Sequence, residues 1–119
     1  MIRYEKMTIT TSALGAGTAT TSAPIIGEII EVCAPGTVWS STADFALVRD
    51  ADYGGTILSL TDAQVPWQHF PRAQLVTSGT AAITNSYDRF ASDDYLTLTV
   101  AGAGSVATDS VYVIYDDLS

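Results

Sequence analysis

The chain has 119 residues, 47% of them hydrophobic, and its thirteen acidic and five basic residues give a formal net charge of −8. This length holds one domain with a modest core, and the hydrophobic content is far above that of disordered chains. The acidic charge disfavours direct binding to nucleic acid or to an anionic membrane surface. We therefore expect one globular domain whose partners are neither nucleic acid nor membrane.

The start of the chain, Met1 to Lys6, lacks the uninterrupted apolar run of a signal peptide, and no segment has the length of a transmembrane helix. These features predict a soluble protein made in a cytoplasm. The single cysteine, Cys33, excludes an intrachain disulfide. Because Cys33 follows an apolar run, we expect it to behave as a small core side chain rather than as a reactive thiol.

The first predicted strand runs from Arg3 to Thr10, and small residues dominate the next segment up to Ala23. Two interpretations of this segment remain open. It is a flexible linker that separates an N-terminal arm from the body, or an extended edge strand that lets a neighbouring subunit approach closely. The Thr-rich composition favours the extended strand. The expected organisation is an arm or edge strand at 1–23 and a β-sandwich domain at 24–119.

Alternation of apolar and polar residues, which is typical of half-buried strands, marks most of the remaining chain. It is clearest at residues 95–100, where Leu96, Leu98 and Val100 share one face. Residues 110–115 are almost all β-branched or aromatic, which indicates a mostly buried strand. Further predicted strands lie at 25–32, 44–48 and 56–60, with a weaker one at 72–77.

Turn-forming residues separate these runs, for example Pro35-Gly36, Ser78-Gly79 and Gly102 to Ser105. No segment has the spacing of apolar residues and the cap of a helix. About seven or eight short strands with regular turns predict an all-β fold, a single β-sandwich or jelly roll with an extended N-terminal arm.

The sequence offers little for catalysis. A nucleophile needs a base within hydrogen-bond reach, but the only histidine is His69 and no nucleophile elbow is present. One cysteine and one histidine do not make a zinc site. Acidic pairs such as Asp93-Asp94 and Asp116-Asp117 lack the EF-hand spacing, although a calcium ion at an acidic loop remains an alternative. We expect no enzyme activity, no catalytic residue, no metal and no cofactor.

Pro66 and Pro71 bracket a stiff aromatic stretch that cannot be a central strand throughout. Its side chains have three interpretations: a protein interface, a stacking platform for sugar rings, or a cover for one open end of the sandwich. The interface residues predicted here are Trp67, His69, Phe70 and Arg72.

A second cluster, Ser86 to Phe90, is predicted to lie in a connection before the strand at 95–100. Here Arg89 pairs locally with Asp88 or reaches an acidic neighbouring subunit. The interface candidates in this cluster are Tyr87, Arg89 and Phe90.

Several short motifs resemble those of small virion proteins of tailed bacteriophages, over about residues 24 to 117. The first are Gly27-Glu28-Ile29, then Gly-Gly-Thr-Ile-Leu within 54–61 and the Trp/aromatic-Pro-Arg segment at 67–72. Tyr-Asp-Arg-Phe at 87–90, Asp-Tyr-Leu-Thr-Leu-Thr-Val at 94–100 and Val-Tyr-Val-Ile-Tyr-Asp at 111–116 follow in order. The chain departs from the pattern at Gln68-His69-Phe70, where relatives carry further tyrosine.

The resemblance implies a capsid decoration, or cement, protein that stabilises capsomer junctions on the outside of the shell, as a homotrimer bound to the major capsid protein. It implies a location on the virion exterior after synthesis in the host cytoplasm, and it transfers no catalytic residue. Two alternatives remain: a glycan-binding or host-adhesion module built on the 66–72 stretch, and a head–tail joining protein on the same fold.

Overall fold

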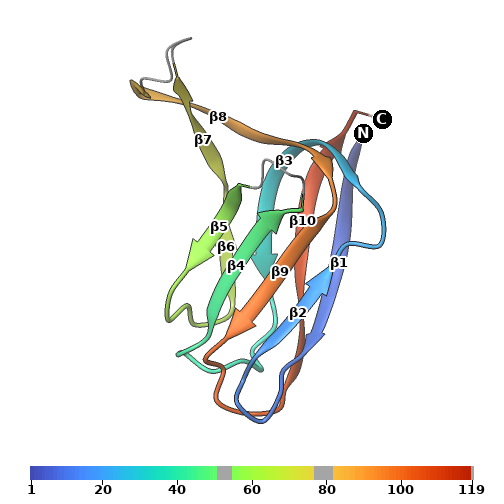
Figure 1. Cartoon of the computed structure of the whole chain (residues 1–119), viewed down its shortest axis with the longest axis vertical. Helices are drawn as coiled ribbons and strands as arrows, with labels where there is room; N and C mark the ends of the chain where they lie inside the picture. The colour runs from blue at the N-terminus through green and yellow to red at the C-terminus, as the bar shows by residue number, and fades with distance from the viewer. Residues whose placement is uncertain (51–54, 77–81, 119) are drawn as a thin grey trace.

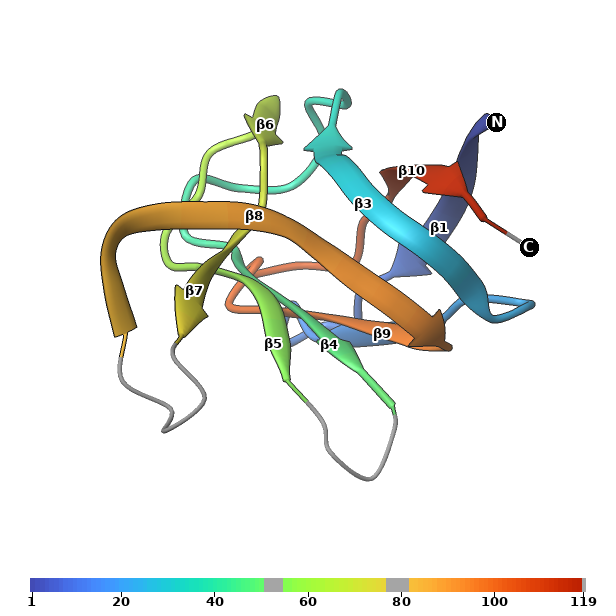
Figure 2. The same ribbon diagram turned by 90° about the horizontal axis from the view of Figure 1, so that it is seen from above.

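The computed structural model describes residues 1–50, 55–76 and 82–118, and their side chains except at 73–76 and 82–90. Within these ranges all regular secondary structure is β, with ten strands in two antiparallel sheets and no helix (Figure 1). The predicted all-β sandwich is confirmed. The two sheets form separate layers when the molecule is viewed from above (Figure 2).

The six-stranded sheet has the order β1-β10-β3-β8-β7, and β6 pairs with a second part of β3. Its strands span β1 Ile2–Thr10, β3 Ile25–Ala34, β6 Trp67–His69, β7 Arg72–Val76, β8 Ala82–Asp94 and β10 Thr108–Asp117. The four-stranded sheet has the order β2-β9-β4-β5. Its strands span β2 Gly17–Thr20, β4 Asp44–Arg49, β5 Thr56–Leu60 and β9 Leu96–Ala101.

The strand order is that of a jelly roll. If β6 and β7 are set aside, the remaining eight strands lie in the orders 1-8-3-6 and 2-7-4-5, counted along the chain. In this arrangement each of the first four strands pairs antiparallel with one of the last four, as in two interlocked Greek keys. The expected number of seven or eight strands corresponds to this jelly roll, and β6 and β7 are an addition between β5 and β8.

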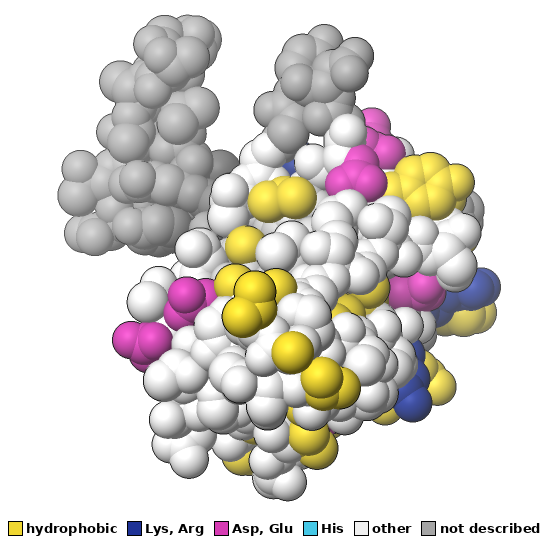
Figure 3. All heavy atoms as spheres, turned by 60° about the horizontal axis from the view of Figure 1, so that its bottom comes forward, with side chains coloured by type: hydrophobic (Ala, Val, Ile, Leu, Met, Phe, Trp, Pro, Cys, Tyr) yellow, Lys and Arg dark blue, Asp and Glu magenta, His cyan; other side chains and the backbone are white. Residues whose placement is uncertain are grey.

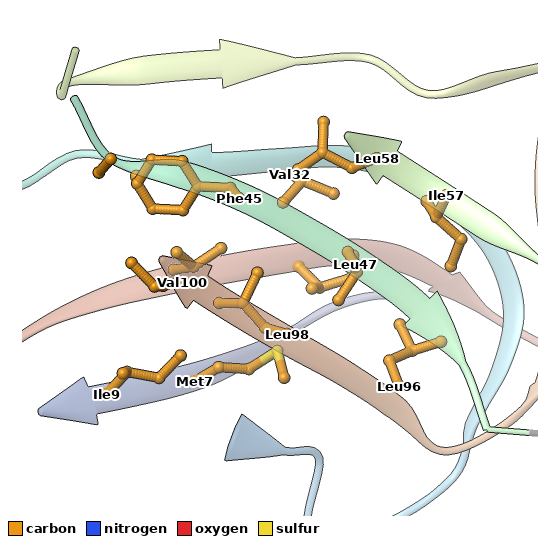
Figure 4. Packing of buried hydrophobic residues seen from close by; sticks show 14 of the residues in the cluster. Met7, Ile9, Val32, Phe45, Leu47, Ile57, Leu58, Leu96, Leu98 and Val100 are labelled. Carbon is orange, nitrogen blue, oxygen red and sulfur yellow. The ribbon is translucent and has the colours of Figure 1, made fainter. Parts of the chain in front are cut away.

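The core lies between the two sheets and follows from the alternation of the sequence. Leu96, Leu98 and Val100 are fully buried, whereas Thr97 and Thr99 between them face outward. Phe45 and Leu47 on β4 point toward the same interior (Figure 4). Burial of each such side chain contributes about 1.5–3 kcal/mol of hydrophobic free energy to folding.

Residues 1–23 contribute the outermost strand of each sheet. β1 pairs with β10 along its whole length, and β2 pairs with β9. Met7 and Ile9 of β1 are buried in the core, beside Leu98 and Val100 (Figure 4). β1 and β2 are thus edge strands, and Met7 and Ile9 pack segment 1–23 into the same core as the described part of 24–118.

The added segment changes the partner of β3. Residues Ile25 to Ile29 of β3 pair with β8, and residues Val32 to Ala34 pair with β6. β8 leaves β3 at this point and continues with β7 as a ribbon that projects from the sandwich (Figures 1 and 2). The strands β6 and β7 and the first part of β8, which we call the added segment, are therefore additional to the eight-stranded jelly roll.

Candidate functional site

The predicted interface residues all fall on this added segment and the β8 strand that follows it. Trp67 and His69 lie on β6, Phe70 follows it, and Arg72 begins β7. The stiff stretch between the two prolines is a short edge strand, because β6 pairs only with β3. The pairing of β7 with β8 thus brings the two predicted clusters, at 67–72 and 87–90, to one side of the molecule.

Trp67 is a packing residue in this structure. Its ring meets the ring of buried Phe45 edge-on, with centroids 5.1 Å apart and an angle of 67°. The ring centroid of Trp39 lies 5.4 Å from that of Phe45, so Phe45 joins three aromatic rings into one cluster. The buried Nε1–H of Trp67 has no acceptor among the described residues. Trp67 is therefore only partly available to a ligand or partner.

Phe70 and Arg72 are the accessible members of this group. Phe70 remains 53% exposed, an unusual state for a phenylalanine. The exposed Arg72 donates from Nη1 to the carbonyl oxygen of its neighbour Pro71 at 2.9 Å, which leaves most of its guanidinium donors free of described partners. His69 is half-buried and lies opposite Val32. Phe70 and Arg72 together have the residue types that dominate protein interfaces.

The second predicted cluster is part of β8 and not of a connection, which corrects the expectation from sequence. Arg89 is the register partner of Arg72, Tyr87 is that of Gln74, and Phe90 is that of Ile29. The backbone of the two clusters is therefore joined by one hairpin. The side chains of Tyr87, Arg89 and Phe90 lie outside the described part of the structure.

A second surface was not predicted from the sequence. It lies on the outward side of β1, β10 and β3, and we call it the β1–β10–β3 face. A shallow groove of about 470 Å³ runs across it. Its lining residues are mostly apolar: Ile2, Arg3, Tyr4, Cys33, Tyr112 and Ile114.

Alternation along β1 produces this face. Met7 and Ile9 turn into the core, so the even-numbered residues of β1 turn outward. Ile2 and Tyr4 are 60% and 67% exposed. The rings of Tyr4 and Tyr112 lie 5.9 Å apart, and the Nζ of Lys6 lies 5.9 Å from the centre of the Tyr112 ring. Apolar and aromatic groups therefore form a continuous exposed patch with a cation at its margin.

A carboxylate, that of Glu31, lies at the opposite margin of the same face. Glu31 on β3 accepts a hydrogen bond from the side-chain amide of Gln68 at 2.6 Å.

Burial, with a smaller contribution from the charge of Glu31, raises the pKa of the Cys33 thiol. Cys33 is therefore a protonated, apolar side chain of the face near neutral pH, as a small hydrophobic residue would be.

The ends of β1 and β10 are held together by charge. The N-terminal amine lies 3.0 Å from Oδ1 of Asp116, and Nε of Arg3 lies 2.9 Å from Oδ2 of Asp117. Burial and then the charges of Asp117 and Glu5 raise the pKa of Tyr115, against the opposing effect of Arg3. The acidic pair Asp116-Asp117 thus neutralises cations of the chain itself.

Across the described residues, no group of three or more His, Cys, Asp or Glu side chains is placed to hold a metal ion. No helix in the described ranges is long and apolar enough to cross a membrane.

No protein-family model and no curated protein matches this chain. Among solved structures it is similar to a chain in the crystal structure of a complex between a serine protease of Aeromonas sobria and a chaperone, with a TM-score of 0.46 and 11% identity. The match covers 98% of this chain and 27% of that one, so this chain spans about a quarter of its length. Similarity at this level carries no information about function.

Proposed function

We propose that this chain is a structural protein of a bacteriophage head that binds the outside of the capsid as a decoration protein. The observation that carries the proposal is the segment added to the jelly roll, which presents Phe70 and Arg72 to solvent. The motifs at 27–29, 54–61, 67–72, 87–90, 94–100 and 111–116, which resemble small virion proteins, support the same assignment.

In this proposal the major capsid protein is the partner of the added segment. Phe70 supplies apolar area and Arg72 supplies several hydrogen-bond donors to the junction between capsomers. Because a shell offers many equivalent sites, and linked copies bind several of them together, each contact needs only modest affinity. The chain's charge of −8 suits a position outside the shell, away from packaged nucleic acid. The homotrimer implied by the resemblance stays a prediction.

The proposal assigns no catalytic residue. The glycan-binding alternative requires Trp67, His69 and Phe70 to form one stacking platform. In the structure Trp67 packs against Phe45, which leaves Phe70 as the exposed aromatic residue of the three.

The test uses capsid shells stripped of this protein, to which the purified chain is added back. We expect saturable binding, with a copy number comparable to the number of capsomer junctions. Phe70→Ala and Arg72→Ala should each weaken binding at least about tenfold, while Ser59→Ala on the four-stranded sheet should leave it unchanged.

Absence of binding by the unmodified chain would overturn the proposed function. Binding that is unaffected by either substitution would overturn only the assignment of the surface. A copy number equal to that of a portal ring, measured by quantitative mass spectrometry of particles, would favour the head–tail joining alternative.

A further inference from the structure

The two outward faces of the sandwich differ sharply in chemistry. The four-stranded sheet presents hydroxyl groups, and Thr20 and Thr97 bond to each other across its strands at 3.0 Å. The β1–β10–β3 face instead presents Ile2, Tyr4, Tyr112 and Ile114, and its hydroxyl pairs, Thr8–Ser110 and Thr10–Thr108, lie toward the Thr10 end of β1. A face of this kind, exposed to water beside a polar face on the same small domain, is typical of an interaction surface.

The charges of the face are arranged across its strands. Lys6 lies on β1 at one margin, and Glu31 lies on β3 at the other, with β10 between them. In Figure 3 the Lys and Arg atoms lie mainly at the right-hand margin, on the side where β1 lies in Figure 1, with acidic and hydrophobic side chains beside them. Lys6 and Glu31 therefore lie on opposite sides of the apolar residues Tyr112 and Ile114.

Such a face complements itself. We infer that the β1–β10–β3 face binds a second copy of this chain through a twofold axis that runs parallel to β10. This rotation places β1 of one copy over β3 of the other, so Lys6 meets Glu31 and, by symmetry, Glu31 meets Lys6. Tyr112 and Ile114 of the two copies then pack against each other at the centre, as the inner faces of a sandwich do.

The size of the face sets the strength of the pairing. Three strands of about six residues cover roughly 14 Å by 20 Å on each copy, which is below the area of stable interfaces and typical of weak, transient contacts. We expect a dimer with a dissociation constant on the order of ten micromolar, weakened by salt because two exposed ion pairs contribute. This inference concerns the purified chain and does not require the capsid.

Sedimentation equilibrium over a concentration series tests it. The unmodified chain should shift from monomer to dimer, and Lys6→Glu or Glu31→Lys should each raise the dissociation constant at least about tenfold. The double variant with both substitutions restores opposite charges and should return to within about threefold of the unmodified chain. Tyr4→Ser should weaken pairing, while Thr99→Lys on the other sheet should not.

Thermal unfolding followed by circular dichroism confirms that each variant is folded, and Tyr4→Ser supplies an independent measurement if a charge reversal disturbs the sheet. A monomer at all concentrations would overturn the inference. An oligomer of any size, including a trimer, would also overturn it if substitutions at Lys6, Glu31 and Tyr4 left its mass and dissociation constant unchanged. Either result leaves the proposal of capsid binding standing. In the same way, a failure to bind shells would not contradict the proposed dimer.

Discussion

Cys33 and His69 lie on paired strands of the six-stranded sheet but project from its opposite faces. In the register of β3 and β6, Cys33 is opposite Gln68, and Val32 is opposite His69. Val32 is fully buried, so the side of β6 that carries His69 turns toward the core and the side that carries Gln68 turns outward. The single thiol and the single imidazole of the chain are therefore not arranged as a nucleophile and its base.

This geometry predicts that the Cys33 thiol reacts slowly with alkylating agents and that its rate of reaction depends on pH. Because burial raises the pKa of Cys33, the reactive thiolate is scarcer at neutral pH than in a free cysteine and increases as the pH rises. Alkylation by iodoacetamide at pH 7 should be slower than that of a cysteine peptide, and His69→Ala should change the rate less than twofold. A large drop in that variant would mean that His69 activates the thiol.

Alternation along β9 predicts that substitutions at neighbouring positions change the free energy of unfolding by very different amounts. Leu98 is fully buried and Thr99 is exposed. Leu98→Ala should lower the free energy of unfolding by about 3 kcal/mol, through lost transfer energy and a cavity, whereas Thr99→Ala should change it by less than about 0.5 kcal/mol. Urea denaturation of both variants measures this, and equal effects would contradict the assigned faces.

The aromatic stretch divides into a structural and an exposed part. Trp67→Ala removes a ring packed on Phe45 and should cost about 2–4 kcal/mol of stability, whereas Phe70→Ala should cost less than about 1 kcal/mol. Thermal unfolding separates the two. If Phe70→Ala were the more destabilising, its effect on shell binding would no longer report on the interface.

Gly27 has a backbone conformation that other residues rarely adopt, with φ of 149°, and a Cβ there would strike the carbonyl oxygen of Asp116. Gly27→Ala should therefore cost more than about 2 kcal/mol, because β3 and β10 must separate locally. Gly104 has φ of 81° but open space around it, so Gly104→Ala should cost only about 1 kcal/mol. The difference between these variants, measured by urea denaturation, isolates the steric clash from the backbone strain.

The pattern of residues within each segment was sufficient to predict the strands, but not to predict which strands pair with each other. The alternation of Leu96, Leu98 and Val100 identifies a half-buried strand from side chains alone, and the structure confirms it. The pairing of Ile2 with Asp116 joins residues at opposite ends of the chain, and nothing in either segment specifies the other. Residues of the same β-branched and aromatic types occur on several strands, so many pairings were equally compatible with the sequence.

The β1–β10–β3 face was missed for a related reason. Tyr112 and Ile114 sit in a run that is apolar on both sides, which is typical of a strand buried on both faces. In the structure only one side of β10 is covered, and Tyr112 and Ile114 remain half-exposed. A signal was nevertheless present in β1, where Ile2 and Tyr4 alternate with the charged residues Arg3 and Glu5. Which side of that alternation faced the core became clear only from Met7 and Ile9.

The position of β10 between β1 and β3 has a consequence for synthesis on the ribosome. Residues 108–117 emerge after the other nine described strands, yet they pair with both the first strand and the third. Until they emerge, β1 has no partner in its sheet, and one edge of β3 is open to pairing with other nascent chains. The six-stranded sheet therefore closes after translation of its final strand, and slowing elongation should not speed native folding of this chain.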